Sequence, residues 1–309
     1  MKAKNELAQH SWFGPSLVTI GVFDGVHRGH QYLLDRLKLK AESEACQSVV
    51  VTFLNHPGTV LRPESSIHYL LPTDQRIRLL NKSGVDQVVS ITFDKELSRL
   101  DPAQFLQLLS GVVDLKGLVV GPDFAMGHQR EGTVPVLQKL GLELGFTVEA
   151  VKPIESDAGW VSSTAIRKSL TDGQVKLASN MLGYQFTVCG RVVQGDGRGK
   201  DLGFPTANLS LEPQIIVPAD GVYATWVRVK GKRLPSATSI GSRPTFGSNP
   251  ITVETHILDF SENLYDSDLT LEFVDRLRNE WRFDNVDALV KQMYRDVLEA
   301  RIVLEGTKS

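Results

Sequence analysis

The stretch Gly21–His30, GVFDGVHRGH, decides how the first half of this chain folds. It follows an apolar run, Leu17–Val22, and leads into a helical pattern that starts at Gln31. A strand, a glycine-bearing turn and a helix start, in that order, point backbone N–H groups at one spot, which suits an anion. His27 and His30 lie at that spot, where imidazoles can donate hydrogen bonds to a phosphate. A histidine-capped turn without a ligand is the alternative interpretation, because short motifs also match by chance.

Around this stretch the first half alternates strands and helices. The expected strands are Leu17–Val22, Ser48–Phe53, Gln87–Phe93, Gly117–Val120 and Thr147–Val151. Helical patterns begin at Gln31, at a cap at Thr73 or Asp74, at Asp101-Pro102 and after Thr133. Alternating βα units predict a parallel, doubly wound sheet with helices on both faces. With strand order 3-2-1-4-5, the loops Gly21–His30 and Gly121–Gly127, GPDFAMG, meet at the carboxyl ends of neighbouring strands.

The second half has a different pattern of secondary-structure signals. A helical connector, Leu170–Gly183, contains a break at Asp172-Gly173. Short alternating strands with many turn signals then predict an antiparallel β domain, a small barrel, which ends in a helix from about Asn285 to Leu304. The expected strands are Gln185–Val193, Gly221–Lys230, Ser236–Ile240, Ile251–Phe260 and Asp268–Leu277. We expect the domains to be 1–183 and 184–309.

Composition narrows the class of protein. A length of 309 residues favours about two domains, and 41% apolar residues, 23% charged residues and a net charge of −2 are ordinary for a globular protein. The absence of a dense Lys/Arg run argues against nucleic-acid and anionic membrane partners. No apolar run approaches the ~20 residues of a membrane span. The polar start and the two isolated cysteines, Cys46 and Cys189, predict a cytoplasmic protein with free structural thiols.

Two further segments join the predicted site of the first half. Thr52–Pro57, TFLNHP, follows the second strand and places His56 at the same sheet edge. Ser162–Arg167, SSTAIR, combines hydroxyls at a helix start with an arginine one turn later. Ordinary helix capping explains the hydroxyls, whereas Arg167 adds a cation that can fork onto phosphate oxygens. Neither GxGxxG nor GxxxxGK[ST] occurs, which disfavours dinucleotide binding and P-loop chemistry.

Gly190–Leu209, GRVVQGDGRGKDLGFPTANL, is the most informative stretch of the second half. A plain hairpin loop is the alternative interpretation. Together with GVFDGVHRGH, it resembles the bifunctional bacterial riboflavin kinase/FAD synthetase family, over nearly the whole chain. The first half is similar to nucleotidylyltransferases through HxGH (His27 to His30), TFLNHP, GPDFAMG and VSSTAIR. The second half is similar to the riboflavin kinase barrel through GRGKDLGFPTAN, GVYA, SIGSRPTFG, VETHILDF and RNEWRF.

The resemblance implies two reactions that use small molecules: ATP phosphorylates riboflavin to FMN, and a second ATP adenylylates FMN to FAD and pyrophosphate. For the kinase it implies Glu254 as general base and Thr206 and Asn208 as Mg²⁺ ligands. From the residues alone, a solvent-facing strand glutamate is the favoured interpretation of Glu254. The ATP phosphates would contact Gly195, Gly197, Arg198, Gly199 and Lys200. The oligomeric state stays open.

For adenylyl transfer, the resemblance implies that His27, His30 and Arg167 stabilise the charge of the transition state. Further ATP contacts would be Gly21, Phe23, Asp24, Gly29, Ser163 and Thr164, although for Asp24 a structural role in the turn is slightly favoured. Flavin contacts would be His56, Asp123, Phe124, Arg243, Arg278 and Glu280, and Phe124 fits a core position equally well.

Some positions depart from the family pattern and bear on flavin affinity more than on chemistry. These are Ser239, Asp266, Pro122, Ala125 and Met126. Two alternatives stay open: a kinase whose first half has lost its activity, and a flavin-binding carrier or regulator without catalysis. Intact HxGH, Asp123 and SSTAIR argue against the first alternative. Glu254 together with PTAN argues against the second.

Overall fold

The structure, a computed structural model, describes residues 1–10, 14–64, 67–152, 155–156, 159–195, 197–242 and 251–307. Its internal contacts divide the chain into two compact units, Met1–Ser163 and Thr164–Ser309. The division falls inside helix α7, Ser163–Thr171, so that most of α7 and all of α8, Val175–Leu182, belong to the second unit. The boundary of the two functional domains at 183/184 stays a prediction.

The first unit is built on a parallel sheet in the order β3-β2-β1-β4-β7, which confirms the predicted strand order. The strands are β1 (Pro15–Gly21), β2 (Gln47–Phe53), β3 (Gln87–Ile91), β4 (Asp114–Val120) and β7 (Thr147–Ala150). β1 and β2 are buried along their lengths, as expected for strands covered on both faces. Because β1 and β4 are neighbours, the loops that follow them leave the sheet at the same edge.

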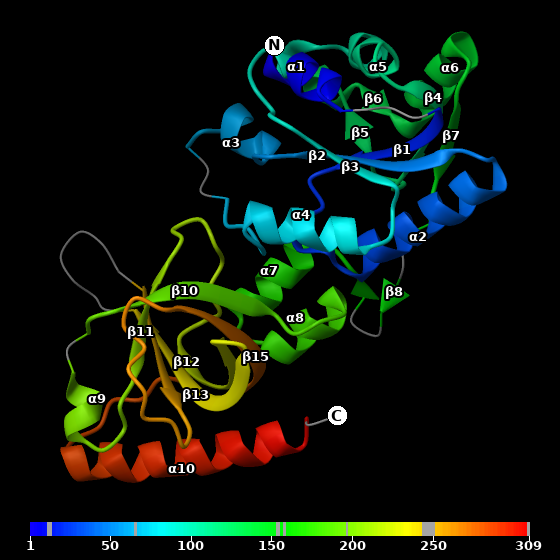
Figure 1. The fold of residues 1–309 in the computed structure, drawn as a ribbon. Coiled ribbons are helices and arrows are strands. Elements are labelled where there is room, and N and C mark those ends of the chain that lie inside the picture. The colour runs from blue at the N-terminus through cyan, green and yellow to red at the C-terminus, as the bar shows by residue number, and fades with distance from the viewer. Residues whose placement is uncertain are drawn as a thin grey trace. The chain divides into compact units, whose positions relative to one another are not determined.

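Helices cover both faces of this sheet (Figure 1). One face carries α1 (Lys2–Ala8), α5 (Pro102–Ser110) and α6 (Val134–Leu144), and the other carries α2 (Arg28–Ser43) and α4 (Thr73–Lys82). Successive side chains of β1 point to opposite faces of the sheet, so Val18 packs in the core on the first face and Leu17 in the core on the second. The shorter elements are η1 (Asp24–Val26), α3 (Pro57–Leu61), η2 (Leu97–Arg99), β5 (Ala125–Met126), η3 (His128–Arg130), β6 (Gly132–Thr133), β8 (Glu155–Ser156) and β9 (Gly159–Trp160).

Helix starts test the capping predictions. Asp101 caps α5 in a reciprocal capping box with Gln104, as Asp101-Pro102 predicted. The cap at Thr73 or Asp74 was wrong: Pro72 is the N-cap residue of α4, and the Thr73 hydroxyl instead donates to the carbonyl of Leu54 at 3.1 Å. α2 begins at Arg28, three residues before the predicted Gln31, because the His27 side chain provides the cap.

The second unit contains a closed antiparallel barrel in the order β10-β11-β14-β13-β12-β15. Its strands are β10 (Thr187–Val193), β11 (Ala207–Leu211), β12 (Gly221–Val229), β13 (Lys232–Ser242), β14 (Ile251–Ile257) and β15 (Asp268–Arg278). The barrel was predicted, but β11 was not, because its residues follow the glycine-rich loop and carry turn signals. β11 closes the barrel between β10 and β14.

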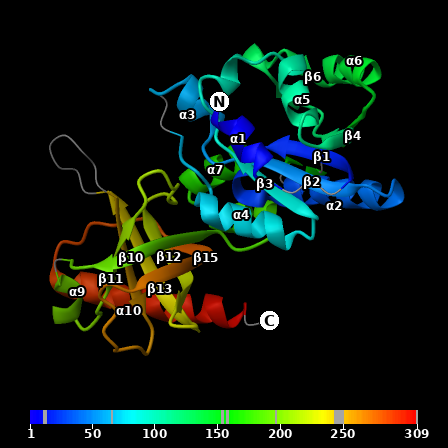
Figure 2. The ribbon, with the colours of Figure 1, turned by 45° about the horizontal axis from the view of Figure 1, so that its top comes forward.

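The remaining helices of this unit flank the barrel. α10, Val286–Glu305, lies along the outside of the barrel (Figure 2). Its residues Ala300 and Leu304 belong to one buried apolar cluster with Trp226 of β12. The predicted break in the connector lies between α7 and α8, where Gly173 has a φ of 76°. α9, Arg198–Asp201, is a single turn in the glycine-rich loop. Both cysteines are free thiols, as predicted. Within the described ranges, no helix combines the length and apolar character that crossing a bilayer requires.

Candidate functional sites in the two units

The turn after β1 has a strained backbone. Phe23, Gly25 and Val26 have positive φ angles of 54°, 80° and 36°. A left-handed conformation at a residue other than glycine costs of order 1–3 kcal/mol and persists only where the surrounding contacts determine it. This turn directly precedes the first helix residue, Arg28, so strain is concentrated where the sequence predicts an anion site.

His27 combines helix capping with a defined tautomer. Its side chain is buried, and its Nδ1 accepts a hydrogen bond from the backbone N–H of His30 at 3.3 Å. In a neutral imidazole the accepting nitrogen carries no hydrogen, so Nε2 carries it. The predicted ligand role and the alternative capping role are therefore compatible, because they use different nitrogens.

His30 stacks on His27 and is desolvated. The two ring centroids are 3.6 Å apart with 17° between the planes, and Phe23 meets the His30 ring edge-on at 5.2 Å. Nδ1 of His30 is buried and has no hydrogen-bond partner among the described residues. Burial, and then the charge of His27, hold the pKa of His30 well below its ordinary value. The His30 ring is thus arranged as a neutral imidazole, and a nearby anion would favour its protonation.

Two glycines allow these rings to pack. A Cβ at Gly29 would lie 3.2 Å from the His27 ring, and a Cβ at Gly21 would lie 3.1 Å from the Phe23 ring. Both contacts are tighter than ordinary van der Waals separation. A side chain at Gly29 would displace the His27 ring from the start of the helix. The role of Gly29 is therefore to leave space for that ring.

Asp24 anchors the strained turn. Its buried carboxylate accepts the backbone N–H of Leu70, with both oxygens 3.1 Å from the nitrogen. Its backbone carbonyl accepts the hydroxyl of Ser163, the first residue of α7, at 2.9 Å. These contacts support the structural interpretation of Asp24, and they bring Ser163 to the turn that carries the histidines.

The loop after β2 is linked by hydrogen bonds to the segment that binds the turn after β1. His56 is the N-cap of α3, and its Nδ1 accepts the N–H of Gly58 at 2.9 Å. The backbone N–H of His56 donates to the Tyr69 hydroxyl at 2.9 Å. Tyr69 precedes Leu70, which binds Asp24, so the segment around Tyr69 joins the loops after β1 and β2.

The loop after β4 contributes one exposed and one packed residue. Asp123 is exposed, and its backbone carbonyl accepts the Arg130 side chain at 3.2 Å. Phe124 packs against the core of the first unit, the alternative that the sequence left open. Thr164 and Arg167 belong to the second compact unit, and their roles in adenylyl transfer stay predictions.

In the second unit, the predicted kinase residues meet across two neighbouring strands. The register of β11 and β14 places Asn208 directly opposite Glu254. The Thr206 hydroxyl donates to Oε2 of Glu254 at 3.3 Å. Glu254 is partly buried and accepts this hydrogen bond from Thr206, and its role as general base stays a prediction beside the alternative of a solvent-facing strand residue.

The glycine-rich loop approaches these residues through its backbone. A Cβ at Gly195 would lie 2.2 Å from Nδ2 of Asn208, and a Cβ at Gly199 would lie 2.4 Å from the carbonyl oxygen of Phe204. Only glycine fits such contacts. Gly197 has a φ of 74° in an open position. The side chains of Arg198 and Lys200 lie outside the described part of the structure.

A cavity of about 530 Å³ opens beside Thr206, whereas Asn208 and Glu254 do not belong to its lining. Thr206 and Thr255 line it together with Val192 and the segment 260–265. This volume falls in the range of small-molecule sites. The sequence did not predict the wall formed by 260–265; its signal was the two aromatic residues Phe260, which ends VETHILDF, and Tyr265.

Two of the three flavin contacts predicted for this unit lie in described segments. Arg278 forms a two-pronged ion pair with Asp296 of α10, at 2.8 and 2.7 Å, and stacks over Trp281 at 4.9 Å. Oε1 of Glu280 lies 2.9 Å from where a Cβ of Gly241 would stand. Arg243 lies outside the described residues.

Comparison with known proteins decides the family. The FAD synthetase family model matches residues 10–165, and the riboflavin kinase family model matches residues 182–304. The chain belongs to the bifunctional riboflavin kinase/FMN adenylyltransferase family. Members of this family from Escherichia coli K12 and Pseudomonas fluorescens are 37% and 39% identical to it, over 94% and 92% of both chains. The member from Bacillus subtilis is 32% identical over 92% of this chain and 91% of its own.

A solved structure supports the fold over the whole length. A crystal structure from Streptococcus pneumoniae, described as a macrolide-efflux protein, superimposes with a TM-score of 0.89 and 31% identity, and the match covers 97% of each chain. The efflux description applies to that protein. Both family models and the curated members agree on flavin chemistry for this family.

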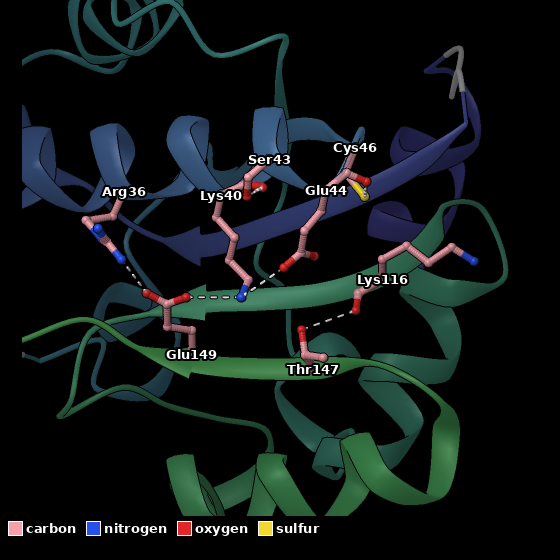
Figure 3. Close-up of polar contacts among 8 residues, drawn as sticks. All are labelled: Arg36, Lys40, Ser43, Glu44, Cys46, Lys116, Thr147 and Glu149. Atoms are coloured by element: carbon pink, nitrogen blue, oxygen red, sulfur yellow. Dashed lines mark hydrogen bonds and ion pairs between the residues drawn. The ribbon is translucent and has the colours of Figure 1, made fainter.

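A second hollow, of about 300 Å³, lies between α2 and β7 and consists of ion pairs. Figure 3 shows Glu149 of β7 held by Arg36 and Lys40 of α2, at 3.3 and 3.2 Å, while Lys40 also reaches Glu44 at 3.1 Å. Burial alone would raise the pKa of Glu149, but Lys40 and Arg36 outweigh it and lower that pKa from its ordinary value. Each of these charges already has a partner, so the hollow is a surface ion-pair network.

Proposed function

We propose that this chain makes FAD from riboflavin in two steps, each of which consumes one ATP. The barrel unit phosphorylates riboflavin to FMN, and the HxGH-containing sheet unit adenylylates FMN. Family membership over both halves supports this division of labour. The observation that carries the proposal is the meeting of Thr206 and Glu254 at 3.3 Å, with Asn208 opposite, beside a ligand-sized cavity.

In the kinase step, Glu254 accepts the proton of the ribityl 5′-hydroxyl as that oxygen bonds to the γ-phosphorus of ATP and the bond to ADP breaks. The glycine-rich loop contributes backbone N–H groups to the phosphates. Thr206, Asn208 and Glu254 offer neighbouring oxygen donors, the ligand chemistry that Mg²⁺ prefers. Thr206 and Asn208 would hold the ion, which neutralises phosphate charge when bound.

In the adenylyl step, an FMN phosphate oxygen attacks the α-phosphorus of ATP and pyrophosphate leaves. The nucleophile is already ionised, so the site needs no general base. It has to stabilise negative charge, and the hydrogen-bond donors of His27 and His30 at the start of α2 are suited to that task. Ser163 and Thr164 would bind phosphate oxygens, and Arg167 would add a positive charge.

The test is incubation of the purified chain with riboflavin, Mg²⁺ and ATP, followed by chromatographic separation of the products. FAD supports the proposal, FMN alone supports a kinase with an inactive first half, and unchanged riboflavin supports a carrier. A parallel incubation that starts from FMN examines the second step separately. A cytoplasmic location, where ATP is available, remains part of the proposal.

A further inference from the structure

Arg76 of α4 is a buried cation that neither proposed reaction uses. It is fully buried, with none of its surface exposed, and it is the largest fully buried side chain among the described residues. A guanidinium stays protonated in proteins, so its charge has to be compensated inside the first unit. Nε and Nη1 have no hydrogen-bond partner among the described residues. Burying a charged group whose nitrogens are not all hydrogen-bonded costs folding free energy, so Arg76 requires a structural or functional explanation.

Arg76 contacts the loop after β2 directly. Its Nη2 donates to the carbonyl of Phe53, the last residue of β2. Phe53 stands three residues before His56, the N-cap of α3. The guanidinium therefore fixes the point at which the chain leaves the sheet toward His56.

Arg76 also acts on the loop after β1. Burial lowers the pKa of Arg76 from its ordinary value, against the opposing attraction of the Asp24 carboxylate. Asp24 is itself buried and lies three residues before His27, inside the strained turn. Its carboxylate also accepts the N–H of Leu70. The positive charge of Arg76 attracts this carboxylate and so helps to hold the turn in place.

The segment 69–70 contacts both of these loops. Leu70 binds Asp24, and Tyr69 both acts electrostatically on Arg76 and accepts the N–H of His56. One cation thus interacts with both the loop that carries His27 and His30 and the loop that carries His56. Its neighbour Arg78 provides a contrast, because it is exposed on the same helix and pairs with Asp74 at 2.7 Å.

We propose that Arg76 is a positioning residue for adenylyl transfer: through Phe53 and Asp24 it sets the loop of His27 and His30 relative to the loop of His56. This inference rests on the function proposed above. A shift of about 1 Å in groups that stabilise a transition state can cost about 100-fold in rate. The loss should appear in kcat more than in KM, because the histidines act on charge that develops during the reaction.

The experiment uses the full chain, in which the kinase reaction of the other unit serves as an internal control. For Arg76→Met we expect kcat of FAD formation from FMN to fall by about 100-fold, with KM for ATP and FMN formation from riboflavin unchanged. Arg76→Lys keeps a charge that attracts Asp24, but its flexible ammonium does not reproduce the planar guanidinium that donates to the carbonyl of Phe53. We expect it to lose about 10-fold in kcat. The matched control Arg78→Met should leave both reactions unchanged.

A wild-type kcat in either folded Arg76 variant overturns the inference, and Arg76→Lys decides alone if Arg76→Met does not fold. A merely structural role predicts a lower unfolding temperature with normal kcat in the folded enzyme. Asp24→Asn/Arg76→Met should recover part of the kcat lost in Arg76→Met, because it removes the uncompensated carboxylate. Failure of the wild-type chain to make FAD refutes the proposed function itself; FAD formation that Arg76 variants do not alter refutes only the positioning role.

Discussion

The imidazole rings of His27 and His30 stack face to face, with 3.6 Å between their centroids, at the start of helix α2. Such a pair tolerates one positive charge poorly and two positive charges worse. Without a ligand, burial and then the charge of His27 therefore hold the pKa of His30 well below its ordinary value. An anionic phosphate at the helix start reverses this preference, since it attracts a proton to the pair.

The first prediction concerns His30 as a source of catalytic charge. His30→Ala should abolish detectable FAD formation, or slow it by at least about 100-fold, because a preorganised donor is lost. FMN formation from riboflavin should persist. Chromatography of both products measures this, with the exposed His128→Ala as control for histidine loss in the same unit. Equal loss of both products would refute separate sites.

The second prediction concerns the protonation of His30. Its pKa in the free chain should lie well below 6.5, because burial and His27 disfavour the imidazolium. As the unfolded chain binds the proton more readily, His30 should reduce stability as the pH falls through 6.5. An NMR titration of the ring Cε1–H should show this low pKa, and added pyrophosphate should raise it. A His30 that titrates normally in the free chain contradicts the buried geometry.

The third prediction separates the kinase from the transferase. Glu254→Gln keeps the size of the side chain but cannot accept the hydroxyl proton, so FMN formation should fall by about 10²–10⁴-fold. Conversion of added FMN to FAD should be unaffected. The exposed Glu212→Gln in the same unit is the control. Normal kinase turnover in Glu254→Gln would reduce Glu254 to a strand residue bonded to Thr206.

The fourth prediction concerns Asp266, one of the positions that depart from the family pattern. Asp266 has a φ of 62°, and its exposed side chain makes only a loose ion pair with Arg191 at 3.6 Å. Asp266→Gly should change the stability of the barrel unit by less than about 1 kcal/mol, since relief of strain and loss of chain stiffness nearly cancel. Asp266→Val should cost about 1–3 kcal/mol, because a β-branched residue resists this backbone conformation. Thermal unfolding of the two variants gives the comparison.

The fifth prediction uses the ion pairs of Figure 3. The folded-state pKa of Glu149 lies below its ordinary value of 4.5, so its pairs stabilise the chain above that pH. The contribution is lost as the pH falls through the lower folded-state value. Glu149→Gln should therefore destabilise the first unit by about 0.5–1 kcal/mol at pH 7 and by almost nothing at pH 3. Urea unfolding at both pH values measures it, and a difference that is independent of pH contradicts the assignment.

Local sequence signals predicted much of the fold. Alternating βα units predicted the parallel sheet, whose strand order agrees with the order 3-2-1-4-5 assumed for it, and Asp101-Pro102 marked the start of α5 correctly. Where the sequence failed, a distant contact had replaced a local one. The Thr73 hydroxyl bonds to Leu54 instead of capping its own helix, and β11 becomes a strand only because β10 and β14 lie on either side of it.

The sequence by itself determined which chemical groups the chain carries and in what order: the two histidines, the glycine-rich loop, the threonine and asparagine of PTAN, and Glu254. These are properties of short segments, and local patterns report them. Only the tertiary structure decided which groups are desolvated and which meet. The hydrogen bond of buried Arg76 to Phe53 and the hydrogen bond of Thr206 to Glu254 join segments apart in the chain, and the lowered pKa of His30 follows first from burial. Desolvation and long-range pairing depend on how the whole unit packs, and no single segment encodes them.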